Sequence, residues 1–145
     1  MLDSVDEQIY SILCSSHTIA VVGLSPKLSR PSYQVASQMQ QYGFKVFPVR
    51  PAVDEILGER VYRTLSDIGS NVDIVNLFRT TEHIPKLVDQ AIEINARCLW
   101  LQDGIQHAST RKAQAAGIAV FMDRCILRDY RRLCLPRADL KPSVS

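Results

Sequence analysis

The chain has no apolar run longer than a β-strand, and its longest apolar segments are far shorter than the ~20 residues that a transmembrane helix needs. Its first 13 residues include Asp3, Asp6 and Glu7 and no basic stretch, so they do not resemble a secretory signal peptide. We therefore expect a cytoplasmic protein that has no membrane partner.

Cysteine is also sparse. The four cysteines, Cys14, Cys98, Cys125 and Cys134, form no CxxC pair and have no histidine at metal-ligand spacing. Neither a zinc site nor a disulfide framework is indicated, and we expect four reduced, buried thiols and no metal.

Net charge is low, at +2, and does not by itself indicate a nucleic-acid partner. Arginine outnumbers lysine, with 12 of the 17 basic residues. Such an excess suits a small polyanionic ligand, because a guanidinium group binds phosphate through paired hydrogen bonds. The length of 145 residues and the 46% of apolar residues predict one globular domain over 1–135, followed by a loosely ordered tail over 136–145.

Five apolar, strand-like segments alternate with helical segments along the chain. The strands are expected at 17–22, 44–49, 72–78, 96–101 and 118–122. This alternation is typical of a parallel sheet covered on both faces, so we predict a Rossmann-like, doubly wound, three-layer α/β fold. The expected strand order is 3-2-1-4-5, which places a ligand crevice at the carboxyl ends of strands one and four.

The loop after the first expected strand has the sequence GLSPKLSRPS and contains a single glycine, Gly23. Ser25, Lys27, Arg30 and Ser32 supply hydroxyl and cationic donors at the start of the next helix. The amide groups and the dipole of a helix N-terminus attract anions, so this loop is a candidate pyrophosphate site. The alternative is that Ser32 caps the helix and that the two cations are merely solvated.

Two nucleotide-binding fingerprints are missing from the chain. A GxGxxG motif would need glycine at Ser25 and Leu28, and no acidic residue ends the second strand to bind a ribose, which disfavours NAD. A Walker A motif is also absent. At the end of the second strand the chain instead has Arg50 between two prolines, where a cation would meet an additional ribose phosphate. Coenzyme A and NADP both carry such a phosphate.

Six segments then share the order and spacing of a known family. They are VVGLSPKLSRPSY, VFPVRP, ILGERVYRTLSDI, DIVNLFR, CLWLQDGI and DRC. Over about Thr18 to Leu133 the chain resembles the small stand-alone CoA-binding proteins, which are similar to the N-terminal domain of the succinyl-CoA synthetase α subunit. The resemblance implies a Rossmann-like domain that binds coenzyme A. It implies phosphate contacts at Gly23, Leu24, Ser25, Arg30, Ser32 and Tyr33, an adenosine end flanked by Pro48, Val49, Arg50 and Pro51, and a crevice lined by Phe78, Arg79, Leu101, Gln102 and Gly104.

Arg50 departs from this pattern, because the family usually has asparagine there. The arginine either strengthens a phosphate contact or indicates a different nucleotide. Three functions therefore stay open: a binding module for CoA or an acyl-CoA that performs no chemistry, an NADP-dependent enzyme with Arg50 on the ribose phosphate, and a degenerate fold that binds a protein.

No residue is predicted to be catalytic. The related synthetases pass phosphate through a histidine, but that histidine belongs to a second domain, so His107 is not expected to be catalytic. A thiol near a pantetheine arm could exchange with it, but Cys125 is expected to be a buried, inert thiol. The predicted partner is a small molecule rather than nucleic acid, and a protein partner stays unidentified.

Overall fold

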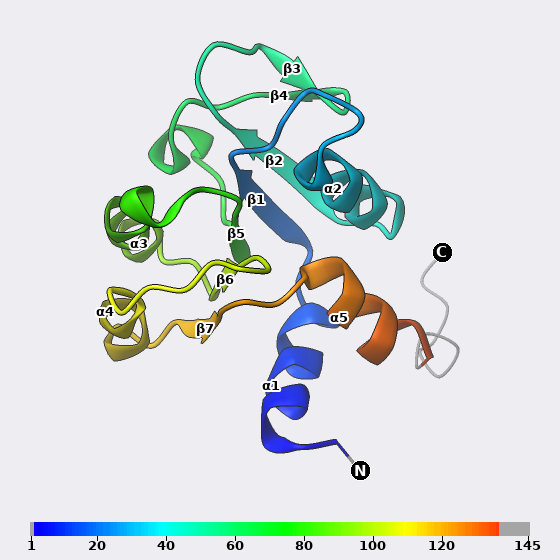
Figure 1. Cartoon of the computed structure of the whole chain (residues 1–145), viewed down its shortest axis with the longest axis vertical. Helices are drawn as coiled ribbons and strands as arrows, with labels where there is room; N and C mark the ends of the chain where they lie inside the picture. The colour runs from blue at the N-terminus through cyan, green and yellow to red at the C-terminus, as the bar shows by residue number, and fades with distance from the viewer. Residues whose placement is uncertain (1, 137–145) are drawn as a thin grey trace.

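The structure is a computed structural model that describes residues 2–136, and it contains a five-stranded parallel sheet between two layers of helices (Figure 1). The sheet order is β2-β1-β5-β6-β7. Its strands are β1 (Thr18–Val22), β2 (Lys45–Val49), β5 (Ile74–Leu77), β6 (Cys98–Leu101) and β7 (Ala119–Phe121). The predicted fold class, a Rossmann-like doubly wound α/β sheet, is confirmed.

The helices divide between the two faces of the sheet because side chains alternate along each strand. Ile19 and Val21 of β1 pack with α1 (Ser4–Leu13), α2 (Pro31–Gln41) and α5 (Ile126–Leu133). Ala20 and Val22 point to the other face, where α3 (Ile84–Glu93) and α4 (Thr110–Ala115) cover the sheet. Figure 1 shows these two groups of helices on opposite sides of the strands.

The predicted strand order is wrong at one point. In terms of the five expected strands the order is 2-1-3-4-5, because β5 pairs with β1 and not with the far edge of β2. Ile19 lies opposite Ile74, and Val22 lies opposite Leu77. The rule of right-handed crossovers fixes the face on which a connection runs, but it does not fix the side of β1 on which the third strand is added. The sheet reverses its direction of growth between β1 and β5, so the ligand crevice belongs there rather than between strands one and four.

The connection from β2 to β5 contains more structure than the sequence predicted. A two-stranded hairpin, β3 (Glu55–Ile56) and β4 (Glu59–Arg60), precedes the expected helical turn, which is the 3-10 helix η1 (Leu65–Ile68). The hairpin turns at Leu57 and Gly58, both with positive φ. Tight hairpin turns with positive φ are usually signalled by Asn-Gly or Asp-Gly in the sequence. Here the pair is Leu-Gly, and leucine rarely adopts positive φ, so no signal of the turn is present in the sequence. A second 3-10 helix, η2 (Thr81–His83), precedes α3.

The expectation of four reduced cysteines is wrong for two of them. Cys14, at the end of α1, and Cys134, at the end of α5, form a disulfide with their Cα atoms 6.0 Å apart. The two residues are 120 positions apart, and sequence spacing cannot reveal a pairing that depends on how the terminal helices pack. Cys98 and Cys125 are free thiols.

Residues 137–145, most of the expected tail, lie outside the described residues, and the single-domain boundary stays a prediction. Over residues 2–136, no helix is long and apolar enough to cross a membrane, and no group of three or more His, Cys, Asp or Glu side chains is arranged to hold a metal ion.

Candidate functional site

The loops after β1 and β5 meet at the crevice through Gly23. This residue has φ +86°, and a Cβ atom on it would lie 2.6 Å from the carbonyl oxygen of Phe78. The amide of Gly23 donates to the Val49 carbonyl oxygen at 2.9 Å, and the amide of Phe78 donates to the Val22 carbonyl oxygen at 2.9 Å. Glycine is thus required for backbone conformation and for a close approach of two backbones.

The candidate phosphate loop is held closed by serine hydroxyl groups. The backbone amide of Ser25 donates to Ser32 Oγ at 3.0 Å, and the amide of Lys27 donates to Ser25 Oγ at 3.1 Å. Ser32 does not cap α2, whose N-cap residue is Arg30. The exposed Lys27 and Arg30 line a cavity of about 460 Å³ together with Gly23.

Arg50 lies between this cavity and a second, smaller one. Its guanidinium group donates to the carbonyl oxygens of Leu24 at 3.3 Å and Pro51 at 3.4 Å, both long hydrogen bonds. Within the described part of the chain it has no carboxylate partner. The guanidinium therefore keeps donors free for an anion on either side.

The second cavity, of about 240 Å³, is strongly basic. Arg50, Arg63, Arg79 and Lys86 line it, and no described acidic residue does. None of these four cations, nor Lys27 or Arg30, takes part in an ion pair among residues 2–136. Unpaired cations converging without a carboxylate create a positive potential, which favours a ligand that carries several phosphates.

A third cavity, of about 720 Å³, continues the crevice past Phe78 toward β6 and α5. Of its lining residues, the sequence predicted Phe78, Arg79, Gln102 and Gly104. It missed others that belong to the start of α2, the loop after β5 and the loop after β6: Pro31, Val35, Thr80, Thr81, Asp103 and Ile105. Most of these residues follow a strand whose carboxyl end was expected at the crevice. Their position after the strand was therefore the signal in the sequence that could have identified them. Cys125, which was expected to be buried, is partly exposed and lines the cavity. Apolar and hydroxyl side chains here suit the less polar part of a ligand.

Some predicted site residues do not line these cavities. Leu24 and Leu101 are fully buried in the two cores, so neither side chain reaches a ligand. Pro48 and Tyr33 are not among the residues that line the three cavities, whereas Val49 and Pro51 line the second. A family resemblance identifies a segment but not which way each of its side chains points. The ligand contacts of all these residues stay predictions.

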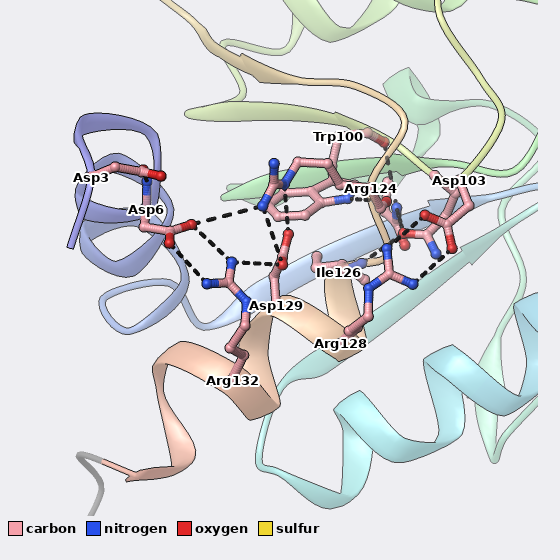
Figure 2. Close-up of polar contacts among 11 residues, drawn as sticks. Asp3, Asp6, Trp100, Asp103, Arg124, Ile126, Arg128, Asp129 and Arg132 are labelled. Atoms are coloured by element: carbon pink, nitrogen blue, oxygen red, sulfur yellow. Dashed lines mark hydrogen bonds and ion pairs between the residues drawn. The ribbon is translucent and has the colours of Figure 1, made fainter.

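The other arginines near the crevice are neutralised by carboxylates. Arg128 donates to Asp103 at 2.8 and 3.1 Å, and these bonds lower the pKa of Asp103. Figure 2 shows the neighbouring network, in which Arg124 and Arg132 converge on the buried Asp129 at 2.8 and 3.0 Å. The cations of this network hold α5 in place, in contrast to the unpaired cations of the first two cavities.

Comparison with known proteins identifies the family of this chain. Residues 17–131 match the family model described as "CoA binding domain". The chain belongs to the CoA binding domain family. The resemblance seen in the sequence is thereby confirmed.

Two similar proteins span nearly the whole CoA-binding domain. The uncharacterized protein YneT of Bacillus subtilis is 38% identical over 120 residues, which cover 82% of this chain and 89% of YneT. A hypothetical protein from Pyrococcus horikoshii has a solved structure that is 34% identical, with a TM-score of 0.85, over 88% of this chain and 91% of that one.

Much longer enzymes carry a similar region. The ADP-forming acetate–CoA ligase of Methanocaldococcus jannaschii is 22% identical over 73 residues, which are 50% of this chain but 10% of the ligase. A dinucleotide-forming acetyl-coenzyme A synthetase of Candidatus Korarchaeum cryptofilum shares the fold, with a TM-score of 0.66 at 23% identity, over 73% of this chain and 25% of that one.

Proposed function

We propose that this protein binds coenzyme A, or an acyl-CoA, across the carboxyl edge of β1, β5 and β6. The observation that carries the proposal is the division of the crevice into two chemically different parts. Around Arg50 it is lined by unpaired cations, and beyond Phe78 it is lined mainly by apolar and hydroxyl side chains. Coenzyme A has the same division, with three phosphate groups on an adenosine end and a pantetheine arm that carries no charge.

The proposal assigns each part of the ligand to one region. The pyrophosphate lies at Gly23, Ser25 and Arg30, where Ser32 holds the loop. The ribose phosphate lies against Arg50, and the pantetheine arm extends into the third cavity beside Gln102. Membership of the CoA binding domain family, and the ligases in which similar regions occur, support this ligand.

Calorimetric titration with CoA, NADP and NAD tests the proposal. CoA should bind and NAD should not, because the chain lacks the glycine pattern and the ribose-binding acid of NAD sites. CoA should also raise the melting temperature, since a ligand that binds only the folded state stabilises it. Absence of CoA binding would contradict the proposal, and an affinity for NADP above that for CoA would replace it with the NADP-dependent enzyme.

A further inference from the structure

Cys125 is an available thiol in the third cavity that ligand binding alone does not require. It occupies the N-cap position of α5, is partly exposed, and makes no capping hydrogen bond with its side chain. It lines the third cavity, as Ile105 does. Of the two free thiols in residues 2–136, the other, Cys98, is fully buried, and burial raises its pKa. Cys125 is therefore the free thiol that a ligand in this cavity can reach.

Gln102 provides a second, independent sign of a ligand beside Cys125. Its side chain is only 5% exposed, and its Oε1 atom accepts from Asn76 Nδ2 at 3.2 Å and from the Ile126 amide at 3.0 Å. The second bond places the carboxamide next to the peptide unit that follows Cys125. Within residues 2–136, however, Nε2 donates to no protein acceptor. Among the described residues the buried side-chain atom left without a partner is Asn76 Oδ1, so Gln102 Nε2 is instead accessible in the cavity, where it can donate to an acceptor oxygen of a ligand.

We propose that Cys125 accepts the acyl group of a bound acyl-CoA, while Gln102 Nε2 donates a hydrogen bond to the thioester carbonyl oxygen. The inference rests on the proposed function, which brings the thioester end of the ligand into this cavity. Cys125 Sγ attacks the carbonyl carbon and forms a new C–S bond. The C–S bond to CoA breaks, and the departing CoA thiolate takes up the proton that Cys125 loses.

The step needs no oxidant and no energy source, because one thioester replaces another. Its extent is set by the ratio of acyl-CoA to free CoA, so the fraction of acylated Cys125 would report that ratio. Val35, Phe78 and Ile105 give part of the cavity wall an apolar surface that suits a small acyl group such as acetyl, and Arg79 lines the same cavity. The carboxylate of Asp103 at the rim is already paired with Arg128, so it does not add an unpaired negative charge there.

The test uses the full chain with its disulfide intact and no added thiol, so that Cys14 and Cys134 cannot react. Excess acetyl-CoA is added, and intact mass and peptide mapping follow acetylation with time. The expected result is one acetyl group on Cys125 and none on Cys98. Acetyl-CoA should react at least roughly 10-fold faster than S-acetyl-N-acetylcysteamine, a thioester without the nucleotide, because binding raises the local concentration of the thioester.

Two variants separate the roles of the thiol and the amide. Cys125→Ser should form no thioester adduct. Gln102→Glu keeps an acceptor oxygen for Asn76 and Ile126 but removes the donor, and it should slow acetylation on the order of 100-fold, as loss of one oxyanion donor does. Rates of parent and variant are compared at saturating acetyl-CoA, so that a change in affinity does not enter the comparison. Binding of desulfo-CoA, which lacks the reacting thiol, is measured on the parent protein.

The outcomes distinguish this inference from the proposed function. If desulfo-CoA does not bind the parent protein, the proposed function itself fails. If it binds but Cys125 stays unmodified, or if Cys98 or the truncated thioester reacts equally fast, only the acyl transfer is refuted. A Gln102→Glu variant that reacts at the parental rate would refute the donor role of Gln102.

Discussion

Replacement of Arg50 with asparagine, the usual family residue, tests how the site recognises the ribose phosphate. Arg50 lies in the wall shared by the two cationic cavities, and its hydrogen bonds to the Leu24 and Pro51 carbonyl oxygens are long. Since no described carboxylate pairs with it, its charge is available to a phosphate. We expect the parent protein to bind CoA more tightly than dephospho-CoA and the variant to lose this preference.

The size of the effect can be bounded from the contact. A hydrogen bond that involves a charged group contributes about 1.5–3 kcal/mol, which corresponds to a factor of roughly 10 to 150 in affinity. Arg50 is partly exposed, and solvent weakens the contact, so the lower end of the range, about 10-fold, is expected. Affinity for dephospho-CoA should change little, because the phosphate loop around Gly23 is unaltered.

Calorimetric titration of both ligands into parent and variant measures the preference directly. Arg60→Asn is the matched control, because it removes the same charge from β4, where Arg60 lies 5.2 Å from the Tyr62 ring centre and lines none of the three cavities. Arg60→Asn should lower the affinities for CoA and dephospho-CoA equally or leave both unchanged. Equal parental affinity for CoA and dephospho-CoA, or an equal loss of preference in Arg60→Asn, would refute the role of Arg50.

Three further predictions concern stability. Gly23→Ala should lower the melting temperature by roughly 6–12 °C, since left-handed strain and the clash with the Phe78 carbonyl oxygen together cost about 3 kcal/mol. Gly58→Ala, at φ +72° with open space around it, should show the strain alone, roughly 2–6 °C, and equal shifts would contradict the clash. Cys14→Ser should destabilise the oxidised protein by about 2–4 kcal/mol in urea unfolding, and reduction of the parent should abolish the difference. Asp6→Asn should flatten the loss of stability below about pH 4, because Arg132 lowers the pKa of Asp6 in the folded protein. The stabilisation by Asp6 is present above the pKa of the unfolded state and is lost as pH falls through the pKa of the folded state, so an unchanged acid profile in scanning calorimetry would contradict this.

The fold class could be read from the sequence because alternating apolar strands and amphipathic helices have one common solution, a covered parallel sheet. The position of β5 could not, because no local signal in 72–78 indicates on which side of β1 the strand is added. The hairpin turn at Leu57 was missed for a related reason, since its positive φ is imposed by tertiary structure rather than by the residue type.

The candidate site shows the same limits. Gly23, Ser25, Lys27 and Arg30 were found because a strand-to-helix loop leaves its polar residues at the sheet edge. Arg63 and Lys86 line the basic cavity but belong to segments with no motif, and only the folded chain brings them together. Leu101 was assigned to the site from the family resemblance, yet its side chain is buried in the core.

The disulfide between Cys14 and Cys134 also determines how this protein responds to mechanical force. The whole sheet and the candidate site lie within the loop that the bond closes. A force applied at the two ends of the oxidised chain is carried by the covalent bond, so it does not pull the strands apart. An unfoldase that threads a protein from one end would meet two covalently joined segments of polypeptide at Cys14 or Cys134. It would have to translocate both together or wait for reduction of the bond.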